Sequence, residues 1–149
     1  KWYGLKGFFT WLEKKAYKFC IDNKHRLTEP RKHVLKIIVS SEKPIKAYEI
    51  LEKLCKIIRN PKPPTAYRAI DFWQTHKFIH RIESLNAYSA CKTKHLHSGS
   101  QFMICDECGK VIESNFYELP QVIKNSVEKK TFTLTKWNLE INGICRECA

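Results

Sequence analysis

The sequence predicts an α+β protein with an N-terminal winged helix-turn-helix domain followed by a small α/β domain. Hydrophobic periodicity in the first 91 residues indicates several helices and then a β-hairpin. Positive charge is concentrated in the same part: residues 1–91 carry 19 Lys and Arg against 8 Asp and Glu, whereas residues 92–149 carry 8 against 7. We therefore expect one domain over residues 1–91, a hinge over 92–100 and a second domain over 101–149.

Three helices are expected before the first proline-rich segment. The first covers residues 10–24 and the third covers residues 46–58. The second starts at Thr28, a candidate N-cap, has Pro30 in its first turn and ends near Ser40. The side chains expected to face the core, two small cysteines among them, are Trp11, Leu12, Ala16, Phe19, Cys20, Val34, Leu35, Ile38, Val39, Ile50, Leu51, Leu54, Cys55 and Ile58.

The prolines of residues 60–64 are expected to break the chain, because proline cannot donate a backbone hydrogen bond. A helix follows over residues 65–76, with Ala66, Ala69, Ile70 and Trp73 at helical spacing on its core face. Two short runs then predict a hairpin. The expected strands are 78–83 and 87–91 in the hairpin and 101–104, 111–116 and 133–141 in the second domain, with a helix over 120–130.

Two CxxC motifs lie in the second domain, one from Cys105 to Cys108 and one from Cys145 to Cys148. Four thiolates suit the tetrahedral geometry of a structural zinc ion, and a two-residue spacer lets both sulfurs of a motif reach one ion. The alternative, a pair of disulfides, belongs to exported proteins. We predict a structural zinc site that stabilises a domain too small for a large core.

The helix over residues 65–76 leaves polar side chains free near its N-terminal end. Arg68 could donate two hydrogen bonds to a guanine, and Thr65 or Tyr67 could contact a phosphate or a thymine methyl group. Further phosphate contacts are expected from Arg31, Tyr48 and Lys62. With the positive charge of this part, these residues predict double-stranded DNA as the partner. The alternative is a basic surface that is merely solvated.

A second set of metal-binding side chains lies around the predicted hairpin and hinge. His80 and Cys91 lie in the hairpin, His95 and His97 in the hinge, and Glu113 follows the first CxxC motif. Imidazole, thiolate and carboxylate groups could together bind a second zinc ion. The alternative is that each side chain is only hydrogen-bonded.

Sharing one ion requires His80 and Cys91 to leave the same face of the hairpin. A slip of one residue in strand register would turn one of them to the opposite face. We therefore predict a loop with an even number of residues, or a bulge that restores the parity. If the two residues paired directly, the turn would lie at Leu85 and Asn86, and a longer loop with the same pairing would contain two more residues.

Four sequence runs carry a resemblance to a known family. They are RLTEPR at residues 26–31, PPTAYRA at 63–69, FIHRIES at 78–84 and CDECGKVIE at 105–113. From about residue 10 to its end the chain resembles the ferric uptake regulator family of bacterial metal sensors. The FIHRIES run, followed by Tyr88 and Cys91, is similar to the family's zinc uptake regulator branch.

The resemblance implies a homodimer that binds operator DNA through its winged helix and represses transcription when zinc is bound. It implies two zinc ions per protomer: a structural ion at Cys105, Cys108, Cys145 and Cys148, and a sensing ion at His80, Cys91, Glu113 and a hinge histidine, His97 in preference to His95. Two alternatives stay open. One is an iron-, manganese- or peroxide-responsive member of the family, and the other is a constitutive DNA-binding protein with only structural zinc.

Other classes of protein fit the sequence poorly. No stretch approaches the roughly 18 apolar residues of a membrane-spanning helix, and the first residues lack the features of a secretory signal. We expect a bacterial cytoplasmic protein without a membrane partner. A zinc deaminase would carry a PCxxC motif, whereas Ile104 precedes Cys105. We expect neither catalysis nor a small organic substrate.

Overall fold

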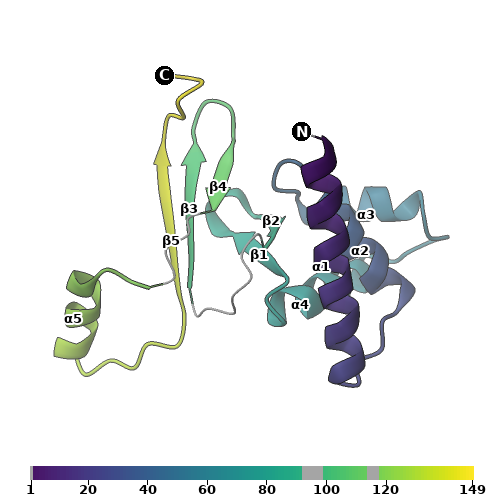
Figure 1. Ribbon diagram of the computed structural model, residues 1–149, viewed down its shortest axis with the longest axis horizontal. Helices are drawn as coiled ribbons and strands as arrows, with labels where there is room; N and C mark the ends of the chain where they lie inside the picture. Colours follow the sequence, from purple (N-terminus) through teal and green to yellow (C-terminus); the bar gives the residue numbers. More distant parts are fainter. Residues whose placement is uncertain (1, 92–98, 114–117) are drawn as a thin grey trace. The chain divides into compact units, whose positions relative to one another are not determined.

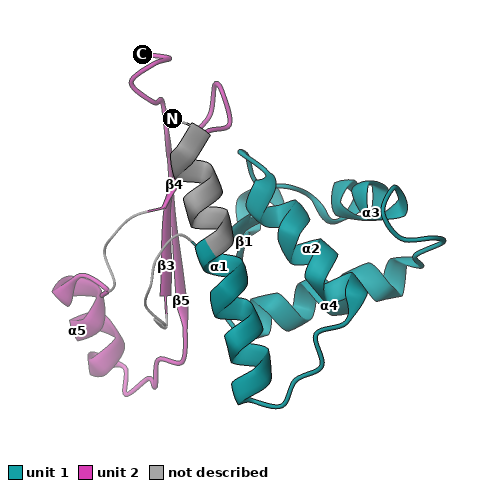
Figure 2. Ribbon diagram, turned by 45° about the vertical axis from the view of Figure 1, so that its right-hand side comes forward, with its two compact units in different colours: residues 1–91 teal, residues 92–149 magenta. Residues whose placement is uncertain are grey.

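The structure is a computed structural model that describes residues 2–91, 99–113 and 118–149, with side chains from residue 11 onward in these ranges. The chain divides into two compact units, Lys1–Cys91 and Lys92–Ala149 (Figure 2). Each unit combines helix and strand, which confirms the predicted α+β class (Figure 1). Within the described part of the chain, no helix is both long and apolar enough to cross a membrane.

Four helices and a hairpin form the N-terminal unit. The helices are α1 (Trp2–Asp22), α2 (Glu29–Ser40), α3 (Ala47–Cys55) and α4 (Pro63–Thr75). Helix α2 contacts the other three helices, and one continuous apolar core joins them to the hairpin. The predicted core face of α4 is confirmed, because Ala66, Ala69, Ile70 and Trp73 are all buried.

Local signals set the helix starts. Thr28 is the N-cap of α2, where its hydroxyl oxygen accepts a hydrogen bond of 3.4 Å from the backbone N–H of Arg31. Helix α4 starts at Pro63, inside the expected break, because a residue in the first helical turn needs no backbone N–H. Helix α1 starts at Trp2, well before the expected residue 10.

The prediction for the two isolated cysteines is right for one and wrong for the other. Cys20 is buried in the core, whereas Cys55 is exposed. Helix α3 buries Ile50 and Leu54, which lie four residues apart on one stripe. Cys55 is the last residue of the helix and lies about 100° away from Leu54 around its axis, so the core face does not reach it.

Strands β1 (Ile79–Ile82) and β2 (Ala87–Ala90) form the antiparallel hairpin. His80 lies opposite Ser89, and residues 83–86 form a four-residue loop in which Asn86 has a φ of +47°. The predicted even loop is confirmed, and the register differs by two residues from one in which His80 would pair directly with Cys91. A two-residue shift keeps every side chain on its face, so the parity is preserved.

The sheet of the C-terminal unit has the strand order β4-β3-β5. Strand β3 (Gly99–Cys105) lies in the centre, antiparallel to β4 (Val111–Glu113) and parallel to β5 (Trp137–Gly143). Strand β3 begins at Gly99, a position expected in the hinge, where a side chain would collide with the Trp137 indole. Helix α5 (Gln121–Lys129) lies between β4 and β5 in the chain, as predicted; residues 114–116 lie outside the described residues.

The described C-terminal unit leaves a row of apolar side chains uncovered. Met103 of β3 lies between Ile112 of β4 and Ile141 of β5 in the strand register, and these side chains are 43%, 42% and 46% exposed. Helix α5 lies away from the sheet (Figure 1) and has no buried residue, although Val122 and Ile123 are apolar and exposed. The described unit therefore exposes a row of apolar side chains on one face of its sheet and further apolar side chains on α5.

Candidate metal centre and nucleic-acid interface

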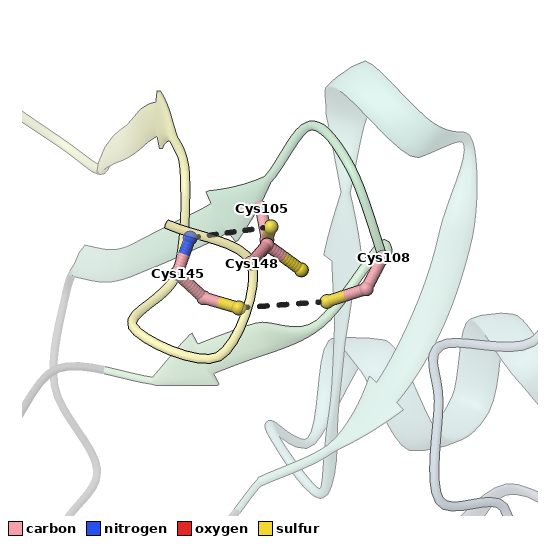
Figure 3. Close-up of side chains that lie close together, drawn as sticks. All are labelled: Cys105, Cys108, Cys145 and Cys148. Atoms are coloured by element: carbon pink, nitrogen blue, oxygen red, sulfur yellow. Dashed lines mark hydrogen bonds between the residues drawn. The ribbon is translucent and has the colours of Figure 1, made fainter.

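The sulfurs of the four CxxC cysteines converge at one end of the C-terminal sheet. Cys105 ends β3 and Cys108 lies in the turn before β4, while Cys145 and Cys148 lie in the loop after β5. Their four sulfur atoms lie within 4.8 Å of one another (Figure 3). The structure therefore brings together all four residues predicted for the structural site.

Backbone hydrogen bonds shape both CxxC loops around this point. The N–H of Gly109 donates to the carbonyl of Cys105 at 3.0 Å, and the N–H of Cys148 donates to the carbonyl of Cys145 at 3.0 Å. Gly109 has a φ of +72°, which a residue without a side chain adopts at low cost. Each loop thus forms a tight turn that directs its two sulfurs to the same side.

The sulfur spacing fits a tetrahedral zinc ion. With a Zn–S bond of about 2.3 Å, neighbouring sulfurs of a regular tetrahedron lie about 3.8 Å apart. The Sγ atoms of Cys108 and Cys145 are 3.7 Å apart (Figure 3). Sulfur donors alone, at this spacing, favour Zn²⁺ over Mg²⁺ or Ca²⁺, which take oxygen ligands.

The hydrogen bonds of the cluster pull the pKa values of its thiols apart. Backbone N–H groups of Cys108 and Cys145 lower the pKa of Cys105 to about 6, and the Cys145 N–H lies 3.3 Å from its sulfur. Contacts with the sulfurs of Cys145 and Cys108 raise the pKa of Cys148 to about 12. One thiolate therefore forms readily, and a bound divalent cation would stabilise the others.

The residues predicted for the sensing site lie on separate elements. His80 in β1 and Cys91 after β2 have ligand atoms within 4.8 Å of each other. The N–H of Cys91 donates to the carbonyl of Phe78 at 2.9 Å, which continues the hairpin ladder by one pair. Glu113 is the last residue of β4 in the C-terminal unit. His97 and His95 lie outside the described residues.

The predicted DNA-contact residues of α4 are available at its N-terminal end. Lys62 precedes the helix and is exposed, as are Tyr67 and Arg68, while Thr65 is half-buried. Tyr48, at the start of α3, is exposed as well. Because Ala66 and Ala69 fix the buried face of α4, Tyr67 and Arg68 are directed away from the core.

Arg31 has contacts within the unit that the sequence did not indicate. Its guanidinium donates to the carbonyl of Arg26 at 2.6 Å and lies 3.8 Å from the centre of the Phe72 ring. Its carbonyl accepts a hydrogen bond of 2.7 Å from the buried Trp73 indole. Arg31 thus links α2 to α4, while its predicted contact with a phosphate stays a prediction.

Sequence reasoning also missed two contacts around the sites. Ile45 forms a bridge to Tyr88 that adds a short third strand segment to the hairpin. Lys110 pairs with Glu147 across the two CxxC loops. The sequence did contain a signal for the second contact: the two CxxC loops were expected to meet at one metal ion, and one loop carries a lysine and the other a glutamate.

These features define a class of protein, a basic winged-helix unit followed by a small unit with a four-thiol metal centre. The ferric uptake regulator family model matches residues 22–142. The zinc uptake regulation protein of Escherichia coli (strain K12) is 34% identical over 135 residues, which cover 89% of this chain and 78% of that protein. The chain belongs to the ferric uptake regulator family.

Solved structures give the same assignment. A structure described as a zinc uptake regulator complexed with zinc and DNA matches with a TM-score of 0.85 and 33% identity, covering 94% of each chain. The structure of holo XcZur matches with a TM-score of 0.82 and 31% identity, covering 94% of this chain and 97% of that one.

Proposed function

We propose that this protein is a zinc-responsive transcriptional repressor that binds operator DNA as a homodimer. The observation that carries the proposal is the four-sulfur cluster in a chain that is 33% identical, over 94% of its length, to a zinc uptake regulator solved with zinc and DNA. In this proposal Cys105, Cys108, Cys145 and Cys148 hold the structural zinc ion. Its role is to hold the C-terminal unit folded, because the free energy of zinc binding at a structural site contributes directly to the free energy of folding.

The sensing site is proposed at His80, Cys91, His97 and Glu113, which gives two zinc ions per protomer. The support from the structure is that His80 and Cys91 leave the same face of the hairpin, with ligand atoms within 4.8 Å. One imidazole and one thiolate are half of a four-coordinate zinc set. Glu113 and His97 supply the other half in the proposal.

Coupling between zinc and DNA follows from where these side chains lie in the chain. His80 and Cys91 belong to the N-terminal unit, which spans residues 1–91, and Glu113 belongs to the C-terminal unit. Ligation by both units would restrict their relative orientation and favour one spacing of the two winged helices in a dimer. Zinc would then raise the affinity for operator, and operator would raise the affinity for zinc by the same factor.

In the proposed DNA complex, α4 enters the major groove with Thr65, Tyr67 and Arg68 toward the bases and sugar-phosphate backbone. Lys62, Tyr48 and Arg31 contribute phosphate contacts. The net charge of +12 for the whole chain favours a polyanionic partner and predicts affinity that falls steeply with salt.

The homodimer is proposed to form through the C-terminal units. The exposed row of Met103, Ile112 and Ile141, together with the apolar residues of α5, supplies the surface that a partner chain would cover. A second copy of the chain carries the same surface, so a two-fold interface is self-complementary. In this proposal the protein acts in the bacterial cytoplasm and catalyses no reaction.

The proposal is tested by counting zinc per protomer before and after mild chelation and measuring operator binding on both samples. We expect about two ions before and one after, with operator affinity lost on chelation and restored by added zinc. Retention of full operator affinity by the one-zinc sample would favour a constitutive DNA-binding protein. Restoration by iron or manganese, but not by zinc, would favour another sensor of the family.

A further inference from the structure

Two charged side chains join the loops that carry the CxxC motifs. Lys110 follows the first motif, and Glu147 lies inside the second, 37 residues further along the chain. The Nζ atom of Lys110 lies 3.1 Å from each of the two carboxylate oxygens of Glu147. A single ammonium group thus contacts both oxygens of a side chain from the opposite loop.

This ion pair lies beside the sulfur cluster. One carboxylate oxygen of Glu147 is 3.7 Å from the Sγ atom of Cys145. A glutamate carboxyl group is ionised at neutral pH, which lies well above its ordinary pKa of about 4.3. When Cys145 binds zinc as a thiolate, the Lys110 ammonium group offsets the repulsion between that thiolate and the nearby Glu147 carboxylate.

Other contacts tie the base of the second loop to the first. The N–H of Asp106 donates to the carbonyl of Gly143 at 2.8 Å, and the Asn142 amide donates to the Asp106 carboxylate at 3.3 Å. Beyond Cys145, the backbone N–H groups of Cys148 and Ala149 donate back to Cys145 within the same loop. The pair of Lys110 and Glu147 therefore links the far part of the second loop to the first.

We propose that Lys110 and Glu147 form a clasp that holds the two CxxC loops together and slows the release of zinc from the four-cysteine site. The inference rests on the proposed zinc occupancy of that site. Release requires one loop to separate from the other, and the clasp opposes this separation. Exposed ion pairs add little to global stability, and these side chains are 46% and 69% exposed. The effect is therefore expected on the local opening of the loops.

The test uses the full-length zinc-loaded protein and a strong chromophoric chelator, after mild chelation has removed any weakly held ion. The variants are Lys110→Gln, Glu147→Gln, Lys110→Arg and the charge exchange K110E with E147K. Lys136→Gln is a matched control, because it removes the same charge from an exposed site before β5. The measured quantity is the rate of zinc transfer to the chelator.

Lys110→Gln and Glu147→Gln should each speed zinc release by roughly 3- to 10-fold. This is at the low end of the effects expected when a side chain that contacts a metal site without binding the ion is lost, because the ion pair is exposed to solvent. Lys110→Arg and the charge exchange should stay within about 2-fold of the parent, as should Lys136→Gln, because a pair of opposite charges is kept or untouched.

Slower zinc release from Glu147→Gln would overturn the clasp. It would show that Lys110 only offsets the negative charge of Glu147 and that the ion pair does not hold the loops together. Equal rates for the parent and both single variants would overturn it as well, as would a charge exchange that releases zinc as fast as the single variants. These outcomes presuppose that the parent keeps one ion through mild chelation. A parent that keeps none contradicts the four-cysteine assignment itself, which is a different result.

Discussion

The two units differ in how much apolar surface they bury. The N-terminal unit has a continuous core in which Trp73, Ile70, Ile50 and Leu54 are fully buried. In the described part of the C-terminal unit, the buried apolar side chains are Phe102, Ile104, Cys105 and Leu119, and α5 contributes none. A unit with so small a core needs another source of stability.

The difference separates the two roles of the protein. A unit that folds on its own core can present α4 to DNA whether or not a metal ion is bound. In the proposed function, the unit with an exposed apolar row and a four-sulfur cluster depends on both a bound metal ion and a partner chain. Metal dependence of folding and metal dependence of DNA binding are therefore expected to arise at different residues.

The largest effect is expected from Cys148→Ser. Loss of one sulfur weakens the structural site, whose zinc binding contributes on the order of 10–16 kcal/mol in comparable sites. The C-terminal unit should unfold and the dimer should dissociate, as calorimetry and analytical ultracentrifugation would measure. The transition of the N-terminal unit should persist. A variant that stays dimeric with an unchanged melting temperature would show that the four cysteines do not hold a structural zinc ion.

The second largest effect is expected from Trp73→Ala, which acts on the opposite unit. Trp73 is 0% exposed, and its indole N–H donates to the carbonyl of Arg31. Truncation should destabilise the N-terminal unit by about 3–5 kcal/mol, measured by urea unfolding. Trp11→Ala is the control at a half-buried site and should cost less. Loss of zinc from the four-cysteine site in Trp73→Ala would contradict the independence of the two cores.

A smaller effect separates two residues at the start of α4. Arg68→Ala should weaken operator binding by about 1–3 kcal/mol and relax the preference at one base position, because it removes a contact to a base edge. Lys62→Ala should weaken all sequences alike and reduce the salt slope by about one. Binding to specific and random DNA at several salt concentrations measures both. Equal losses on both DNAs for Arg68→Ala would make Arg68 a phosphate contact.

The smallest effect concerns pH. Burial, and then the charges of His25 and Arg31, lower the pKa of His76, whose ring lies 4.8 Å from that of His25. The unfolded chain then binds a proton more tightly than the folded unit. The contribution of His76 to stability is complete above the ordinary histidine pKa of about 6.5 and falls as pH decreases below it.

This pH effect is measured by urea unfolding of the parent and of His76→Gln between pH 5 and 8. The parent should lose more stability than the variant as the pH falls, and the difference between them isolates His76 from the other histidines. Parallel curves for the two proteins would show that His76 titrates alike in the folded and unfolded chains.

Features encoded by neighbouring residues could be predicted from the sequence. The Thr28 cap, the buried stripe of α4 and the CxxC motifs depend on spacings of a few residues, and the structure contains all of them. Features that depend on where an element ends or on distant contacts could not be predicted. Cys55 is exposed because α3 stops there, and His80 faces Ser89 because the four-residue loop lies at residues 83–86. The pairing of Lys110 with Glu147 required the folded loops.

In the proposed function, zinc controls DNA binding at residues separate from those that hold the C-terminal unit folded. The most direct test is operator affinity at buffered free zinc for the parent and for Cys91→Ala. The parent should gain affinity with rising zinc. Cys91→Ala should stay dimeric, keep the zinc of the four-cysteine site, and show no gain. A zinc-dependent gain equal to that of the parent would contradict the claim.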